Sequence, residues 1–545
     1  MERVIPDAAD RSPGPRAFLA VDAGTVTNAV SLIGRVEGRW RLLGATAAPA
    51  GVGVDALARR VVERLRRADA AIADHLGLAP DRLARLPRVT SRTVVPPVAA
   101  VVGGSGRVAA RLASAVTLAG WRPRTVAVHD GDPLAITRVL LDPAVDTIVA
   151  GSADPPAADE RGHLVELLEL VLAALERRPE LTLVLVGGLG RQSARVEDRL
   201  PGRPGPTLVA AAIVGEGVAE PLTELMHGLR GDDDEGRHAL VTATATLARV
   251  LGRRLEVVEI GANSGTRIRA EIAPDGSVGV ASATIAAAAL VPDEVPDGVV
   301  DGVAGWSTLR LDRLRLRDRL RELRVAPWGE VHGEGAELRL AAARAALTRL
   351  VEATPHLSTA VPDLVIAAGG VWSVAPGSAV GLALADVLRR PGAAGLAYDH
   401  ARLLGPLGTI EDEVERHAVI GDLVDDLLAP LGSVVMPAEL RAGRAAGDLL
   451  VHAAGGMSEL ALVPGGLELV DLPPGEHATV ELRFRDPVVL GTRGRRFAIE
   501  LGGGLGGLLV DLRDVPLRLP ERPDRRRELL AAWQSALWAG VEDGR

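Results

Sequence analysis

The stretch LAVDAGTVTNAV at residues 19–30 places reactive side chains directly after an apolar run. Asp22 closes the run, Gly24 follows it, and the hydroxyls of Thr25 and Thr27 lie two residues apart. A glycine lets backbone N–H groups approach an anion closely, and the two hydroxyls can bond the same anion. A carboxylate at the strand end can hold Mg²⁺ through water, because this ion keeps much of its hydration shell. The pattern predicts a turn that binds nucleotide phosphates.

A second junction of this kind occurs far along the chain. LEVVEIGANSGTRI at 255–268 is an apolar strand that ends in Glu259 and is followed by Gly261 and Ser264. Two such turns that face each other would clamp phosphates from both sides. We therefore expect Asp22 and Glu259 to be the catalytic carboxylates, each acting on Mg²⁺ through bound water.

A third junction ends in a glycine pair. LVIAAGGVW at 364–372 is an apolar strand followed by Gly369 and Gly370. Without a Cβ atom, this backbone would let an adenine or ribose lie against it. We expect the pair to contact the adenosine part of the nucleotide, with simple packing of a strand against a helix as the alternative.

The composition excludes several classes of chemistry. The 545 residues include no Cys and no Lys, which rules out disulfides, thiolate nucleophiles, Schiff bases and the P-loop lysine. A net charge of −9 and only 2% aromatic residues argue against nucleic-acid binding. No apolar run reaches the roughly 18 residues of a membrane helix, and the N-terminus lacks the apolar core of a signal peptide. We expect a cytoplasmic protein that binds neither nucleic acid nor membrane.

The spacing of apolar residues predicts an α/β protein. Between about residues 90 and 260, short apolar strands alternate with helices, as in βαβ units around a mostly parallel sheet. After about residue 448, strands separated by Gly and Pro turns predominate. We divide the chain into a disordered tail over 1–16, an N-terminal lobe with the βαβ region over 17–253, a second lobe over 254–447, and a small β-rich domain with a terminal helix over 448–545.

These motifs resemble those of the actin-like ATPase superfamily, which includes actin, Hsp70 and the sugar and acetate kinases. VDAGTVT fits its first phosphate loop, and Ala367–Gly370 fits its adenosine loop. EIGANSGT stands where the second phosphate loop belongs, but Glu259, Ala262 and Thr266 replace the usual Asp, second Gly and terminal Asp. The resemblance implies two lobes that bind ATP and Mg²⁺ between them.

Within that superfamily the chain resembles the glutamate mutase L family, accessory proteins of coenzyme B12-dependent carbon-skeleton mutases. VDTIVAGSADPP retains Gly151 and Asp154 of a family turn, DLVIAAGGVW resembles a second family segment, and GGGLGGLLVDLRDVPLRLPE resembles the C-terminal signature. The resemblance implies an ATP-driven chaperone or reactivase whose partner is a cobalamin-dependent mutase subunit, such as that of glutamate mutase.

Three other functions compete with this interpretation. The altered second loop is compatible with a pseudo-ATPase that acts as a scaffold rather than as a weak ATPase. A small-molecule kinase of the same superfamily would need a catalytic base that the sequence does not identify. GGSGRVAA, with Gly104, Gly106 and Ala109, matches a dinucleotide-binding fingerprint, and Asp130 stands where its ribose-binding acid belongs.

One arginine-rich segment has two interpretations. TLRLDRLRLRDRLRELR at 308–324 could form a surface for an anionic partner. We favour a solvated helix, because Leu316, Leu320 and Leu323 fall on one helical face and acidic residues balance the charge.

Overall fold

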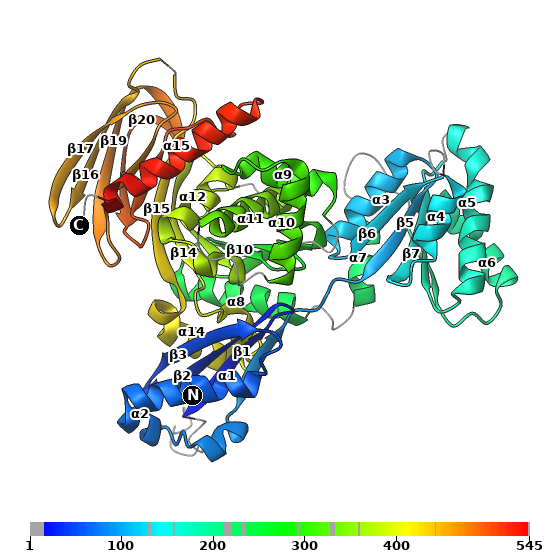
Figure 1. Cartoon of the computed structure of the whole chain (residues 1–545), viewed down its shortest axis with the longest axis horizontal. Coiled ribbons are helices and arrows are strands. Elements are labelled where there is room, and N and C mark those ends of the chain that lie inside the picture. Colours follow the sequence, from blue (N-terminus) through cyan, green and yellow to red (C-terminus); the bar gives the residue numbers. More distant parts are fainter. Residues whose placement is uncertain are drawn as a thin grey trace, which may run out of the picture.

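The described part of the chain folds into four β-sheets and the helices that cover them (Figure 1). The computed structural model describes residues 16–128, 132–155, 158–211, 220–230, 235–290, 295–326, 333–357, 360–441 and 443–542. Asp130 and most of the tail that we expected over residues 1–16 lie outside these ranges.

The first sheet, which we call lobe I, is built around one buried strand. The strands β1 (Ala17–Ala23), β2 (Thr27–Val36) and β3 (Arg39–Pro49) form an antiparallel meander, and β4 (Arg88–Arg92) pairs in parallel with β1. The strand order is therefore β3-β2-β1-β4. Helix α1 (Val54–Ala68) buries an apolar stripe against β1 and β2, as its helical spacing predicts.

The second sheet, lobe II, repeats this arrangement. The antiparallel meander is formed by β10 (Leu255–Ile260), β11 (Gly265–Ile272) and β12 (Val278–Ile285). Strand β13 (Leu364–Ala368) pairs in parallel with β10, and β14 (Gly392–Tyr398) pairs in parallel with β13. Lobes I and II thus share one strand order, and each begins with a strand that ends in a predicted site carboxylate.

The C-terminal part of the chain contributes to two sheets. Strands β21 (Leu508–Asp511) and β18 (Leu467–Val470) continue the sheet of lobe II beyond β15 (Ala429–Met436), which brings it to eight strands. The sheet therefore crosses residue 448, where the sequence suggested a domain boundary. A separate antiparallel sheet has the order β17-β16-β19-β20, with the bounds Gly456–Leu462, Gly447–Ala453, His477–Leu490 and Thr492–Gly502.

Buried ion pairs join this C-terminal part to lobe II. Arg513, two residues after β21, forms an ion pair with Asp386 at 2.7 Å and with Asp511 at 2.7 Å. Arg389 pairs with Asp511 at 2.6 Å, and the guanidinium of Arg513 lies 4.4 Å from the ring centroid of Trp533. The C-terminal stretch that resembles a family signature therefore has a structural task in this chain.

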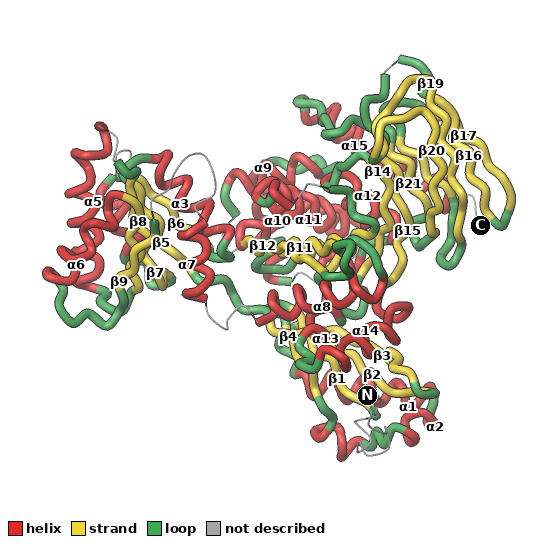
Figure 2. The backbone as a smooth tube through the Cα atoms, turned by 180° about the vertical axis from the view of Figure 1, so that it is seen from behind, coloured by secondary structure: helices red, strands yellow, loops and turns green. Residues whose placement is uncertain are grey.

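An inserted unit lies to one side of lobe II (Figures 1 and 2). Its five strands are all parallel in the order β6-β5-β7-β8-β9, with the bounds Arg122–Ala127, Val98–Gly103, Val145–Ser152, Thr182–Gly187 and Thr207–Ala210. The predicted fingerprint at Gly104 and Gly106 connects β5 to helix α3 (Gly106–Leu118). A Cβ on Gly103 would come 2.4 Å from the Ala109 nitrogen, so this strand and helix pack closely.

Helices cover both faces of the lobe II sheet. The arginine-rich segment forms α10 (Arg313–Val325), and the expected burial of Leu316, Leu320 and Leu323 is confirmed. The remaining helices of the described residues are α2 (Ala70–His75), α4 (Pro133–Leu140), α5 (Ala158–Arg177), α6 (Ser193–Arg199), α7 (Glu220–Arg230), α8 (Glu235–Leu251), α9 (Asp297–Trp306), α11 (Gly333–Ala353), α12 (Gly377–Val387), α13 (Leu404–Gly408), α14 (Glu413–Leu427) and α15 (Pro523–Glu542), with short 3-10 turns at Pro80–Arg85, Gly188–Gln192, Ala286–Ala288, Pro355–Leu357 and Gly370–Val374.

Among the described residues, no helix is both long enough and apolar enough to cross a membrane.

Candidate nucleotide site

A cavity of about 360 Å³ opens at the carboxyl ends of β1 and β10. Residues from both lobes line it, together with the loops after β13 and β14. Every site residue predicted from the sequence lies in its wall: Asp22, Gly24, Thr25, Thr27, Glu259, Gly261, Ser264, Gly369 and Gly370. Ligands of open α/β sheets bind at this edge, where the strands end.

The two predicted phosphate turns are closed by the same kind of backbone hydrogen bond. The N–H of Gly24 donates to the carbonyl of Thr27 at 3.1 Å, and that of Gly261 donates to the carbonyl of Ser264 at 2.8 Å. In each lobe the carboxylate stands two residues before the glycine, and a hydroxyl residue closes the turn. The second turn therefore keeps the closing hydrogen bond and the spacing of the first, although its sequence differs.

The two turns also contact each other directly. The Asn263 side chain donates from Nδ2 to Oγ1 of Thr25 at 2.7 Å. This bond joins residues 238 positions apart. A phosphate held by one turn would consequently lie within reach of the other.

Two glycines lie where the turns after β10 and β13 approach the Glu259 carboxyl group. A Cβ added to Gly261 would stand 3.0 Å from Glu259 Oε1, and one on Gly369 would stand 3.2 Å from it. Gly369 has a φ of 96°, and its Cβ would also come 2.4 Å from the carbonyl oxygen of Ile260. A side chain at Gly369 would therefore displace backbone.

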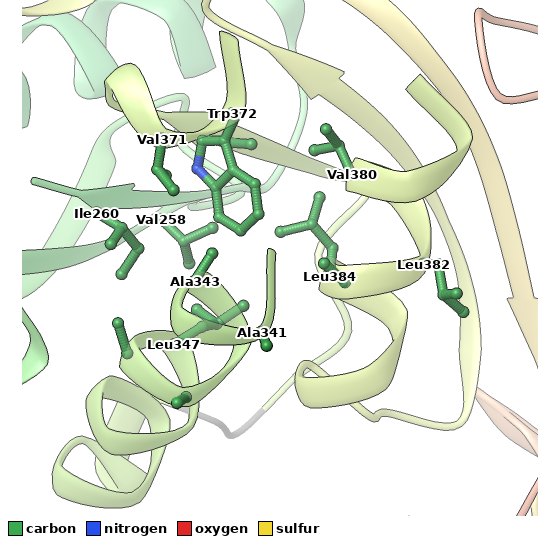
Figure 3. Close-up of a cluster of buried hydrophobic side chains, with 14 of the residues drawn as sticks. Val258, Ile260, Ala341, Ala343, Leu347, Val371, Trp372, Val380, Leu382 and Leu384 are labelled. Carbon is green, nitrogen blue, oxygen red and sulfur yellow. The ribbon is translucent and has the colours of Figure 1, made fainter. Parts of the chain in front are cut away.

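Trp372 anchors the backbone next to the glycine pair. Figure 3 shows its indole among Val258, Val371 and neighbouring apolar side chains of the lobe II core. The ring is 1% exposed, and its Nε1 donates to the carbonyl of Ala368 at 3.0 Å. The backbone of the third turn is thus fixed by packing and by a hydrogen bond.

Three carboxyl groups of the cavity have raised pKa values. Burial raises the pKa of Asp22 to about 6, and the nearby Arg402 opposes this shift. Burial and then the Asp22 charge raise the pKa of Glu259 to about 8, again against Arg402. Burial raises the pKa of Asp399 to about 6, although the backbone N–H groups of Leu403 and Leu404 donate to its carboxylate. The cavity therefore favours cations or protons beside these groups.

Asp399 and Arg402 were not predicted from the sequence. Both follow β14, in the stretch AYDHARLLG, and both line the cavity. The available signal was a carboxylate directly after a buried strand, the same signal that identified Asp22. Neither a glycine nor a hydroxyl follows it within three residues, so it did not match the pattern of the phosphate turns.

Further arginines line the cavity. Arg230 ends α7, Arg237 lies in α8, Arg339 lies in α11, and Arg92 ends β4. Because this chain has no lysine, every such cation is a planar guanidinium, which suits carboxylate and phosphate oxygens. The cavity wall as a whole combines hydroxyls, bare backbone and guanidinium groups, which is the chemistry of a phosphate site.

The donors fit phosphate groups better than they fit a directly bound metal ion. The described residues contain no group of three or more His, Asp or Glu side chains that could hold a metal. Asp22 already lies 3.9 Å from an Nη atom of Arg402. Two carboxylates, Asp22 and Glu259, would suit a Mg²⁺ ion held through water, and such an ion would neutralise phosphate charge.

No family model and no curated protein matches the chain. Solved structures do align with it. An activator of the 2-hydroxyisocaproyl-CoA dehydratase from Clostridium difficile with bound ADPNP is 9% identical, with 75% of this chain and 97% of that chain covered and a TM-score of 0.28. Component A of the (R)-2-hydroxyglutaryl-CoA dehydratase of Acidaminococcus fermentans is 8% identical, with 73% and 98% covered and a TM-score of 0.27. A carbohydrate kinase from Novosphingobium aromaticivorans is 17% identical, with 73% and 91% covered and a TM-score of 0.21.

The class of the protein follows from its own strand order. It is a mixed α/β protein with two lobes that carry the same strand order and meet at a cavity. The fold class expected from the sequence is confirmed. Membership of the glutamate mutase L family stays a prediction.

Proposed function

We propose that this protein is an ATP-binding accessory factor of the actin-like class that serves a cobalamin-dependent carbon-skeleton mutase. The observation that carries the nucleotide part is the pair of matched turns, which face each other and are joined by the bond from Asn263 to Thr25. The backbone N–H groups and hydroxyls of such turns can bind phosphates from both sides. Gly369 and Gly370 leave backbone bare at the cavity wall for an adenosine.

The nucleotide part is tested by calorimetry and by phosphate release. The pure protein should bind ATP and its non-hydrolysable analogue, and Asp22→Ala should abolish any hydrolysis. Chemistry of this kind depends on positioning and charge rather than on covalent steps. A protein that binds no nucleotide under any condition would overturn the proposal.

A second candidate function is nucleotide binding without turnover. The second turn favours it, because Thr266 stands where the superfamily has an acid and its hydroxyl is held by Thr284 at 3.0 Å. Glu259 and Ala262 likewise stand where the superfamily has an Asp and a second Gly. Nucleotide binding without phosphate release, together with turnover gained by the double variant Glu259→Asp, Ala262→Gly, would support this candidate.

The mutase part rests on the sequence resemblance and needs its own experiment. A cobalamin-dependent mutase that is inactivated by a bound damaged cobalamin should regain activity when this protein, ATP and fresh coenzyme are added. The Asp22→Ala variant is the matched control. If the protein binds ATP but no such mutase is restored or bound, the partner assignment fails while nucleotide binding stands.

A further inference from the structure

The side chain of Arg402 lies where the turns of the cavity meet. Its Nη1 donates to Thr27 Oγ1 at 2.7 Å and lies 3.9 Å from Asp22 Oδ2. Its Nη2 fills the space beside Gly370, where an added Cβ would come within 2.2 Å of it. The side chain is 11% exposed. One guanidinium thus contacts the first phosphate turn of lobe I and the glycine pair of lobe II.

The backbone of Arg402 is held in an uncommon conformation. Its φ is 54°, one of three positive values at non-glycine positions among the described residues. The adjoining turn is fixed, because Asp399 accepts hydrogen bonds from the N–H groups of Leu403 at 2.8 Å and Leu404 at 3.1 Å. A left-handed arginine persists only where its surroundings determine it. The structure therefore maintains the direction in which this side chain points.

The charge of Arg402 acts on the whole acidic side of the cavity. It opposes the rise in pKa of Asp22, Glu259 and Asp399. A guanidinium carries five N–H donors, so one hydrogen bond to Thr27 does not exhaust it. Its planar fork also matches two phosphate oxygens at once.

We propose that Arg402 is the resident cation of the phosphate site and allows a nucleotide to bind without a divalent metal ion. Its guanidinium would contact the phosphates that Thr27 binds and supply the positive charge that Mg²⁺ supplies elsewhere. This inference rests on the proposed nucleotide binding. It adds that Arg402 neutralises the phosphates and that binding does not require a divalent metal ion.

The test is a calorimetric titration of ADP and of a non-hydrolysable ATP analogue, in EDTA and in Mg²⁺. The wild-type affinity in EDTA should lie within about threefold of that in Mg²⁺. Arg402→Gly removes the side chain but keeps a residue that accepts a φ of 54°. Loss of a charged hydrogen bond predicts an affinity at least about tenfold lower in EDTA. Mg²⁺ should restore part of that loss.

Two controls separate a charge effect from a backbone effect. Glu37→Gly also replaces a left-handed residue by glycine, here at a φ of 52° in the exposed hairpin turn between β2 and β3. It should leave nucleotide affinity unchanged. Guanidinium ions at millimolar concentration should restore binding to Arg402→Gly and have no effect on the wild type.

The outcomes distinguish this inference from the function on which it rests. A wild-type protein that binds nucleotide only with Mg²⁺ overturns the role of Arg402 and leaves the proposed function standing. So does an Arg402→Gly variant that binds as well as the wild type in EDTA. A wild-type protein that binds no nucleotide in either buffer overturns both.

Discussion

At the residue scale, the cavity is shaped by positions where backbone stands in place of side chains. Gly261 and Gly369 both border the Glu259 carboxyl group, and Gly370 borders the guanidinium of Arg402. The end of a titratable side chain therefore lies against a glycine at each point. An added methyl group would meet backbone at Gly369, the guanidinium at Gly370 and the carboxyl group of Glu259 at Gly261.

Replacing Gly369 by Ala should destabilise the protein by about 1–3 kcal/mol, because the new Cβ meets a carbonyl oxygen and φ is 96°. Chemical denaturation measures the change. Gly298→Ala, with open space around the added methyl group, is the control and should not destabilise. Equal stability of Gly369→Ala and wild type would contradict the geometry.

Glu259 should make stability depend on pH. Burial and the Asp22 charge raise its pKa from 4.5 to about 8, so the folded state keeps a proton that the unfolded chain releases. The free energy of unfolding should then fall as pH rises from about 4.5 to 8, by at most about 1.4 kcal/mol per pH unit. Thermal unfolding in EDTA across this range should show a smaller decline for Glu259→Gln. An identical decline in both proteins would contradict the assignment.

At the scale of elements, the strand β10 carries two carboxylates with different tasks. Glu259 at its end faces the cavity, whereas Glu256 is fully buried and pairs with Arg267 at 2.8 Å, Arg269 at 3.4 Å and Arg390 at 2.5 Å. The buried cluster joins β10, β11 and the loop before β14. It fixes the strand that presents Glu259.

Glu256→Ala should cost about 3–5 kcal/mol, because it leaves three guanidinium groups around an empty position in the interior. Equilibrium unfolding in urea measures this loss. Glu271→Ala is the matched control, since its carboxylate pairs with Arg269 while its side chain stays 52% exposed; it should cost less than about 1 kcal/mol. Similar losses for both variants would contradict the role of the cluster.

The elements also show what the sequence could and could not predict. A phosphate turn is local: Asp22, Gly24 and Thr27 lie within six residues. Their spacing in the sequence therefore predicts that they lie together in the fold. Arg402 reaches Thr27 from 375 residues away, and no local pattern encodes that contact. The pairing of β18 and β21 with lobe II is likewise non-local, since strands that look alike in sequence can join either sheet.

At the scale of the whole molecule, lobe II lies between lobe I, the inserted unit and the C-terminal sheet (Figure 2). Lobe I contacts it along β3, where the backbone N–H of Trp40 donates to Asp422 at 3.0 Å and that of Leu42 donates to Asp426 at 3.2 Å. At the cavity, Asn263 and Arg402 of lobe II contact the turn of lobe I. The two lobes are thus linked both at β3, the edge strand of lobe I, and at the first phosphate turn.

Asn263→Ala should loosen the link at the cavity without unfolding either lobe. One hydrogen bond contributes about 0.5–1.5 kcal/mol, so backbone amides of residues 24–27 should exchange hydrogen several-fold faster, on the order of fivefold. Hydrogen-exchange mass spectrometry of the nucleotide-free protein measures this, with peptides of the inserted sheet as the internal reference. Unchanged exchange at the first turn would contradict the role of Asn263.

The pairing of β21 with β15 has a consequence for how the chain folds as it leaves the ribosome. The described strands of lobe I have all been synthesised by Arg92, whereas the eight-stranded sheet lacks two of its described strands until Asp511 follows. Between the synthesis of Met436 and that of Leu508, β15 presents an unpaired edge, which other chains could extend. The late arrival of residues 508–511 therefore makes the stretch of synthesis after residue 436 the period in which this protein most needs protection from aggregation.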